Sequence, residues 1–139
     1  MELNFGDIDW LALLACVVAG QITLTVWFVV LFGEPWAKAY GGEAMTKEQH
    51  TKEVPMYTYG IGAACVFLLS LTISLLHGAL GVASVGAALQ LACLLAVGVF
   101  VAMAMPGYAF LRKWSAWSIA AGSQVVLICV VSLILVLWP

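Results

Sequence analysis

Four long apolar runs constrain this chain more than any other feature of its sequence. They cover residues 10–32, 57–76, 82–105 and 115–138, and none of them contains Asp, Glu, Lys or Arg. About 20 helical residues cross a hydrocarbon core of ~30 Å, so each run is long enough to span a membrane. The sequence therefore predicts an all-α, polytopic integral membrane protein: a single domain, 1–139, built as an antiparallel bundle of four transmembrane helices.

The composition argues against a soluble domain, and the pattern argues against membrane-spanning strands. Only 9% of the 139 residues are charged and 65% are hydrophobic, and so few charges cannot cover a surface exposed to water. Membrane barrels alternate apolar and polar residues, whereas stretches such as GAACVFLLSLTISLL do not. In lipid every backbone amide needs a partner within its own span, which leaves the helix as the expected structure.

The basic side chains predict the orientation of the chain in the membrane. Lys38, Lys47 and Lys52 follow the first run, Arg112 and Lys113 follow the third, and the remaining connections and ends hold no base. The positive-inside rule places both basic loops in the cytoplasm and both termini outside, in a multi-pass protein of the inner (cytoplasmic) membrane. The segment ahead of the first run carries acids and no base, unlike a secretory leader, so we expect the first helix to be retained.

The tryptophans stand mostly near the ends of the apolar runs. An indole ring favours the membrane–water interface, where the ring stays in the acyl boundary and its N–H reaches water. We therefore expect all six to act as interfacial anchors: Trp10, Trp27, Trp36, Trp114, Trp117 and Trp138.

Residues 33–56 form the predicted cytoplasmic loop. Pro35 cannot continue the hydrogen-bond ladder of the first helix, and residues 36–40 fit a short helix lying on the membrane surface. Thr46 followed by Gln49 fits a capping box and predicts a second short helix. The loop is nearly neutral, so we do not expect it to bind nucleic acid or anionic lipid by charge. A solvated connector is favoured over a docking surface for a partner.

The polar side chains within the runs are candidates for an intramembrane site. Gln21, Gln90 and Gln124 lie inside the predicted spans, and Thr25 stands one helical turn after Gln21. An amide that faces lipid is costly, so we expect the glutamines to point inward and to pair with one another or with backbone. Two interpretations stay open: the amides line a path for a small solute, or they hold neighbouring helices together.

The remaining reactive side chains form no recognisable catalytic or metal-binding set. The four cysteines fall one in each run, without the spacing of a metal site. His77 is predicted to lie in the outer turn between the second and third helices, where it caps a helix end, and His50 lies in the cytoplasmic loop. We expect no catalytic residues, no metal and no cofactor, and hence no enzyme.

Two short stretches carry a resemblance to a known family. The chain contains Trp27, the element Phe32-Gly33-x-x-Trp36 that follows it, and an aromatic, a basic pair and a tryptophan over residues 110–114. In these stretches the chain resembles the bacterial membrane proteins grouped as domain of unknown function 1761. The resemblance covers nearly the whole chain and implies four spans and a bacterial inner membrane, but no activity.

These expectations lead to two functional hypotheses. The first is a non-enzymatic structural or accessory subunit, which packs into a homo-oligomer or with other membrane subunits, because small residues recur at helical spacing in the runs. The second is a passive channel or facilitator for a small solute, lined by the intramembrane glutamines. The lipid bilayer is the expected partner in both cases, and nucleic acid in neither.

Overall fold

A computed structural model describes residues 3–139, so Met1 and Glu2 of the N-terminal segment lie outside it. The described residues form helices joined by short turns, with no strand among them. In chain order the elements are η1 (Phe5–Asp7), α1 (Trp10–Thr25), η2 (Val26–Leu31), α2 (Gly33–Gly41), α3 (Lys47–Glu53), α4 (Tyr57–Leu80), α5 (Val85–Leu95), η3 (Ala96–Val101), α6 (Ala102–Phe110) and α7 (Trp114–Leu137).

Four helical stretches are long and apolar enough to cross a membrane, which confirms the predicted fold class. They are Trp10–Leu31, Tyr57–Leu80, Val85–Phe110 and Trp114–Leu137, of 22, 24, 26 and 24 residues. Asp9 starts the first stretch, because its carboxylate accepts hydrogen bonds from two backbone amides of the first turn of α1.

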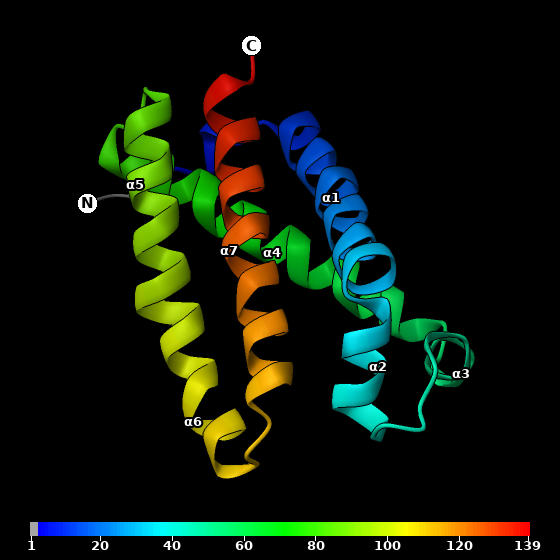
Figure 1. Cartoon of the computed structure of the whole chain (residues 1–139). Helices are drawn as coiled ribbons and strands as arrows, with labels where there is room; N and C mark the ends of the chain where they lie inside the picture. The colour runs from blue at the N-terminus through cyan, green and yellow to red at the C-terminus, as the bar shows by residue number, and fades with distance from the viewer. Residues whose placement is uncertain (1–2) are drawn as a thin grey trace.

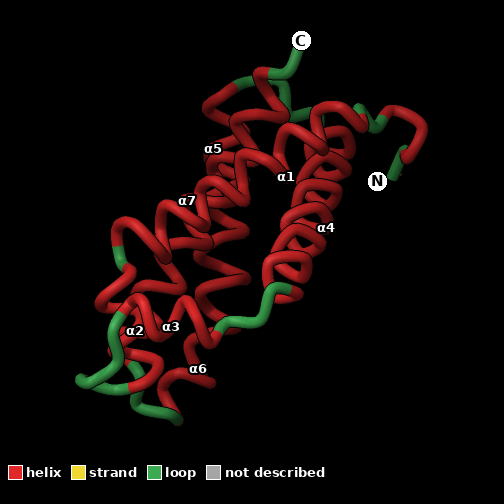
Figure 2. Tube along the Cα trace, turned by 90° about the vertical axis from the view of Figure 1, so that its right-hand side faces the viewer, coloured by secondary structure: helices red, strands yellow, loops and turns green. Residues whose placement is uncertain are grey.

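Helix α7 lies at the centre of the bundle and contacts α1, α4 and α5 (Figure 1). The core is built from small and branched side chains of all four spans, which lets the helices approach closely. Its fully buried members are Cys16, Val66, Ile73, Ala92, Ala96, Leu127, Ile128 and Val131. In the view of Figure 2, α1 and α4 lie side by side, in agreement with the contacts between them.

The second span extends beyond its predicted end at residue 76, and this corrects the position of His77. Helix α4 continues to Leu80, where Gly81 adopts a left-handed conformation (φ 64°) and ends it. His77 therefore lies in the last turn of α4 and is buried, with Nε2 2.8 Å from Ser132 Oγ. Since Ser132 Oγ donates to the Ala88 carbonyl, it accepts from His77, and the pair joins α4, α7 and α5.

Two spans contain π-helical segments, η2 and η3, within otherwise α-helical stretches. In η2 the Phe32 amide donates to the Trp27 carbonyl five residues earlier, at 2.9 Å. A π turn holds more residues than an α turn, so it changes the direction of the side chains that follow, and such turns are frequent at functional sites. Phe32 then leaves helical geometry (φ −119°), and the chain bends into α2.

The break before α2 lies at Phe32 rather than at Pro35, and α2 is longer than the predicted helix over 36–40. Pro35 occupies the first turn of α2, where a missing backbone N–H breaks no helical hydrogen bond. Gly42 closes the helix with a φ of 89°. The predicted capping box is confirmed: Thr46 Oγ1 accepts from the Gln49 amide, and the Gln49 side chain accepts from the Thr46 amide.

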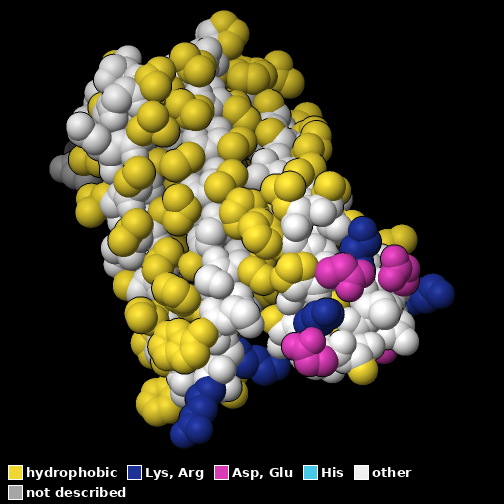
Figure 3. All heavy atoms as spheres, viewed as in Figure 1, with side chains coloured by type: hydrophobic (Ala, Val, Ile, Leu, Met, Phe, Trp, Pro, Cys, Tyr) yellow, Lys and Arg dark blue, Asp and Glu magenta, His cyan; other side chains and the backbone are white. Residues whose placement is uncertain are grey.

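The Lys and Arg side chains gather at the end of the molecule formed by α2, α3 and the turn between α6 and α7 (Figure 3), whereas Asp7 and Asp9 lie at the other end. Lys113 links the two basic segments there, because its Nζ donates to the carbonyls of Ala39 and Tyr40 at 3.2 and 3.4 Å. A cation at the C-terminal end of α2 is favoured by the helix dipole. At the other end Trp138 Nε1 donates to Asp9 Oδ2 at 3.0 Å, so the C-terminus lies beside the start of α1.

Candidate functional site

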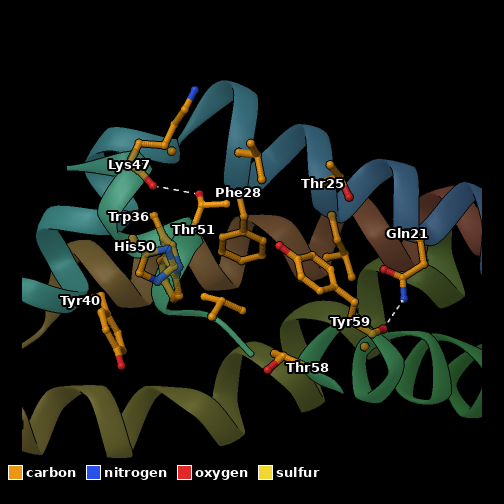
Figure 4. A pocket seen from close by; sticks show the side chains of 15 residues that line it. Gln21, Thr25, Phe28, Trp36, Tyr40, Lys47, His50, Thr51, Thr58 and Tyr59 are labelled. Carbon is orange, nitrogen blue, oxygen red and sulfur yellow. Dashed lines mark hydrogen bonds between the residues drawn. The ribbon is translucent and has the colours of Figure 1, made fainter. Parts of the chain in front are cut away.

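A cavity of about 350 Å³ lies between the first span and the start of α4, next to the folded-back helices α2 and α3 (Figure 4). Its size suits a small organic molecule or part of a larger one. The lining residues are Gln21, Leu24, Thr25, Phe28, Val29, Gly33, Trp36, Tyr40, Lys47, His50, Thr51, Val54, Thr58, Tyr59 and Gly62. We call this space the interfacial cavity, because it lies beside the charged end of the molecule.

The first span and the bend that follows η2 build this cavity. Adjacent residues of a helix point in different directions, so the Trp27 ring turns toward α7 whereas Phe28 lines the cavity. The Trp27 indole donates from Nε1 to the Ile119 carbonyl at 2.9 Å and leaves no room for a side chain at Gly122. The bend at Phe32 then brings Trp36 of α2 back onto Phe28.

Aromatic rings from four elements, η2, α2, α3 and α4, line the cavity. Phe28 and Trp36 meet edge to face with ring centroids 4.8 Å apart, a favourable geometry for two π systems. Tyr40 and His50 make a second edge-to-face contact at 5.0 Å. Figure 4 shows the Tyr59 ring between Phe28 and Gln21, with its hydroxyl directed toward Phe28.

Polar groups stand among these rings. Gln21 Nε2 donates to the Tyr59 carbonyl at 3.3 Å, which ties the first span to α4, and Gly62 leaves space for the amide. Thr51 Oγ1 donates to the Lys47 carbonyl at 2.8 Å. In Figure 4 the Tyr59 hydroxyl and the His50 imidazole make no hydrogen bond to another lining residue, so both can bond to a ligand.

The charge of the site comes from its rim. None of the lining residues is Asp or Glu, and Lys47 is the one Lys or Arg among them. The Lys47 stem packs over Gly33, since a Cβ built at Gly33 would lie 3.1 Å from Lys47 Cγ. Figure 4 shows its ammonium group directed away from the aromatic rings. Glu34 Oε1 accepts from the Lys47 amide at 3.3 Å and fastens α2 to α3.

The structure does not bring the predicted intramembrane glutamines together. Gln21 is half-buried and, with Thr25, lines the interfacial cavity. Gln90 is exposed on the surface of α5, so the expectation that its amide points inward is wrong. Gln124 is half-buried on α7, outside the cavity lining. The positions of the glutamines in the sequence do not reveal which face of its helix each side chain occupies.

The tryptophans also divide into two groups. Trp10 and Trp114 are 62% and 51% exposed, so their rings reach the molecular surface as an interfacial anchor requires. The other four instead contact the protein. Trp27 reaches α7, Trp36 lines the cavity and Trp138 bonds Asp9. The Trp117 Nε1 atom is buried without a hydrogen-bond partner within residues 3–139.

Sequence reasoning missed Phe28, His50 and Tyr59 as site residues. A faint signal was present, because the capping box at Thr46 predicts a helix that carries His50, and the segment after Trp27 is rich in aromatics. What the pattern did not predict was the π turn and the bend at Phe32 after it, which bring α2 and its Trp36 back onto Phe28.

Comparison with known proteins confirms the resemblance noted from the sequence. The family model described as "Protein of unknown function (DUF1761)" matches residues 11–136, which is nearly the whole chain and includes all of the cavity-lining residues. Among curated proteins and among solved structures, nothing matches. This chain, with its four apolar helices and its interfacial cavity, belongs to the DUF1761 family.

Proposed function

We propose that this protein is a non-enzymatic membrane subunit that binds an amphiphilic, lipid-like molecule in the interfacial cavity. The observation that carries the proposal is the aromatic lining of a 350 Å³ space beside the charged end of a four-span bundle. A ligand there has its tail among apolar helices and its head near the water-exposed helices α2 and α3. This is the division that an amphiphile needs.

The rim of the cavity supports a ligand that enters from the bilayer. Tyr59 is 47% exposed and Tyr40 is 61% exposed, and the lining residues Thr25 and Thr58 are also exposed. Tyrosine and tryptophan are favoured where one end of a side chain is apolar and the other end is wet. The cavity is therefore accessible from the side, between α1 and α4, rather than through the centre of the bundle.

The chemistry of the lining favours binding over catalysis. A nucleophile needs an adjacent base, and that base needs a group that orients it. Within the lining the hydroxyl of Thr51 donates to a backbone carbonyl, and no carboxylate stands near His50 among the lining residues. The passive-facilitator hypothesis gains less support, because Gln90 is exposed and Gln124 lies outside this cavity.

Assembly with further copies or other subunits stays part of the proposal. In the most apolar 18-residue stretch of each span, only 17–33% of the residues are buried within the chain, so most of the apolar surface faces lipid or a neighbouring subunit.

The test is to fill the cavity with a larger side chain and to measure which co-purified lipid-like molecules the protein retains. We expect Thr25→Trp to displace bound lipid-like molecules, because the indole occupies the rim of the cavity. The matched control is Ile22→Trp, which places the same indole on an exposed position of α1 outside the lining. Both variants and the wild type are purified in mild detergent, and co-purified molecules are identified by native mass spectrometry.

The proposal predicts one or more masses that are retained by the wild type and by Ile22→Trp and are lost from Thr25→Trp. Equal retention by all three proteins contradicts it, as does the absence of any retained amphiphile in the wild type.

A further inference from the structure

The electrostatics of the interfacial cavity narrow the class of amphiphile, provided that the proposed function holds. The interior offers no Asp or Glu to neutralise a cationic head. Lys47 is the one Lys or Arg in the lining, but its ammonium points away from the rings, and Glu34 lies against the Lys47 amide. Burying an unpaired charge is costly, so the cavity favours a head that is neutral.

The shape of the lining favours a flat head. The rings of Phe28, Trp36 and Tyr59 stand around one space, and rings of this kind gain by offset or edge-to-face contact with another ring. A flexible phosphodiester or glycerol head makes poorer use of such surfaces than a planar ring does. Gly62 of α4 and Thr25 of α1 bound the same space without adding an aromatic ring to it.

The hydrogen-bonding groups stand on both sides of this space. In Figure 4 His50 lies on the side of Trp36, and Gln21 lies at the opposite end beyond Tyr59. The Tyr59 hydroxyl and the His50 imidazole are free to bond, since neither contacts a polar lining atom. A ligand with one acceptor at each end of a flat ring can accept from both.

We infer that the interfacial cavity binds a neutral amphiphile whose planar ring carries hydrogen-bond acceptors on opposite sides, with an apolar tail that leaves between α1 and α4. This is the chemistry of a lipoquinone. The ring lies among Phe28, Trp36 and Tyr59, the two carbonyl oxygens accept from His50 and Tyr59, and the tail lies in the bilayer. The inference concerns binding and includes no redox step.

Three short-tailed probes test this inference on the full chain in lipid nanodiscs: decylubiquinone, decylbenzene and decyl phosphate. They share a tail and differ in the head, which is a ring with two carbonyls, a plain ring or an anion. Native mass spectrometry gives the occupancy of each probe on the protein as a function of its concentration. We expect decylubiquinone to bind saturably and at least tenfold more tightly than either of the others, since it alone fits both the rings and the donors.

Two conservative variants locate the contacts. Tyr59→Phe keeps the ring and removes the hydroxyl, and His50→Phe keeps an aromatic ring and removes its nitrogens. Each is expected to weaken decylubiquinone binding about fivefold, the usual effect of one neutral hydrogen bond, and to leave decylbenzene binding unchanged. Tyr57→Phe is the matched control, because Tyr57 is 70% exposed and outside the lining.

Three results would overturn the inference: no saturable binding of decylubiquinone, equal binding of decylbenzene, or tight binding of decyl phosphate that Lys47→Ala abolishes. The last result assigns the site to an anionic head. If Thr25→Trp still displaces a co-purified amphiphile while decylubiquinone does not bind, the proposed function stands and only the lipoquinone inference fails.

Discussion

At the scale of single residues, small side chains decide how closely the spans approach. Gly20 of α1 is buried where α1 meets α4 and α7, and a Cβ at this position would lie 2.5 Å from Val66 Cγ1 and 3.1 Å from Leu127 Cδ1. In lipid, close packing of helices replaces much of the hydrophobic driving force available in water. The sequence predicted such ladders of small residues, but not which of them are in contact.

This contact gives a first prediction. Gly20→Ala should destabilise the protein by about 1–3 kcal/mol, because the added methyl forces the branched side chains of Val66 and Leu127 to move. Gly60→Ala is the matched control on α4, where nothing lies within 4 Å of the new Cβ; it should be neutral or slightly stabilising. Unfolding in mixed detergent micelles measures both, and equal stability of the two variants would refute the packing argument.

At the scale of helices, periodicity predicts the spans well and their irregularities poorly. Any long apolar run without charges gives the same signal whether its helix is α throughout or contains a π turn. Thus the four spans were predictable, whereas the segments at η2 and η3 were not. The end of α4 was also misplaced, because His77 and Gly78 read as a polar turn although His77 bonds Ser132 inside the bundle.

The π turn of η2 yields a prediction at this scale. Deleting Val30, which is 68% exposed, should let the segment form a regular α-helix. The chain after the deletion, including Phe32 and α2, then rotates relative to Phe28, so Trp36 loses its contact with Phe28. We expect retention of the bound amphiphile to fall about tenfold, the loss of roughly one good aromatic contact, while circular dichroism shows unchanged helix content.

Val30→Ala is the control for this deletion, because it removes the side chain but keeps the length of η2. It should retain the amphiphile as the wild type does. If the deletion variant also retains it fully, the π turn is not what places Trp36 against Phe28.

At the scale of the whole molecule, the fold joins features that the sequence keeps apart. The cavity needs α2 and α3 to fold back against the first span, and this depends on the bend at Phe32, the Glu34–Lys47 contact and the link from Lys113 to α2. The two contacts join separate elements, 13 and 74 residues apart, so no helix-length pattern predicts them. By contrast, the segregation of basic charge to one end follows directly from the position of the five Lys and Arg residues.

That segregation makes the predicted orientation testable. If both basic loops are cytoplasmic, a membrane-impermeant amine reagent added to intact cells does not reach any of the four lysines: Lys38, Lys47, Lys52 and Lys113. After permeabilisation, the lysines that are exposed on the protein surface react. Mass spectrometry of the recovered protein reads each lysine separately. Lys113 and Lys38 are both exposed, but Lys113 Nζ donates to two carbonyls of α2, whereas Lys38 Nζ has only the exposed Glu43 carboxylate at 3.8 Å. We therefore expect Lys113 to react more slowly. Labelling of Lys38 and protection of Lys52 in intact cells would place the two ends of one loop on opposite faces of the bilayer, and neither the bundle nor the cavity between η2, α3 and α4 is compatible with that result.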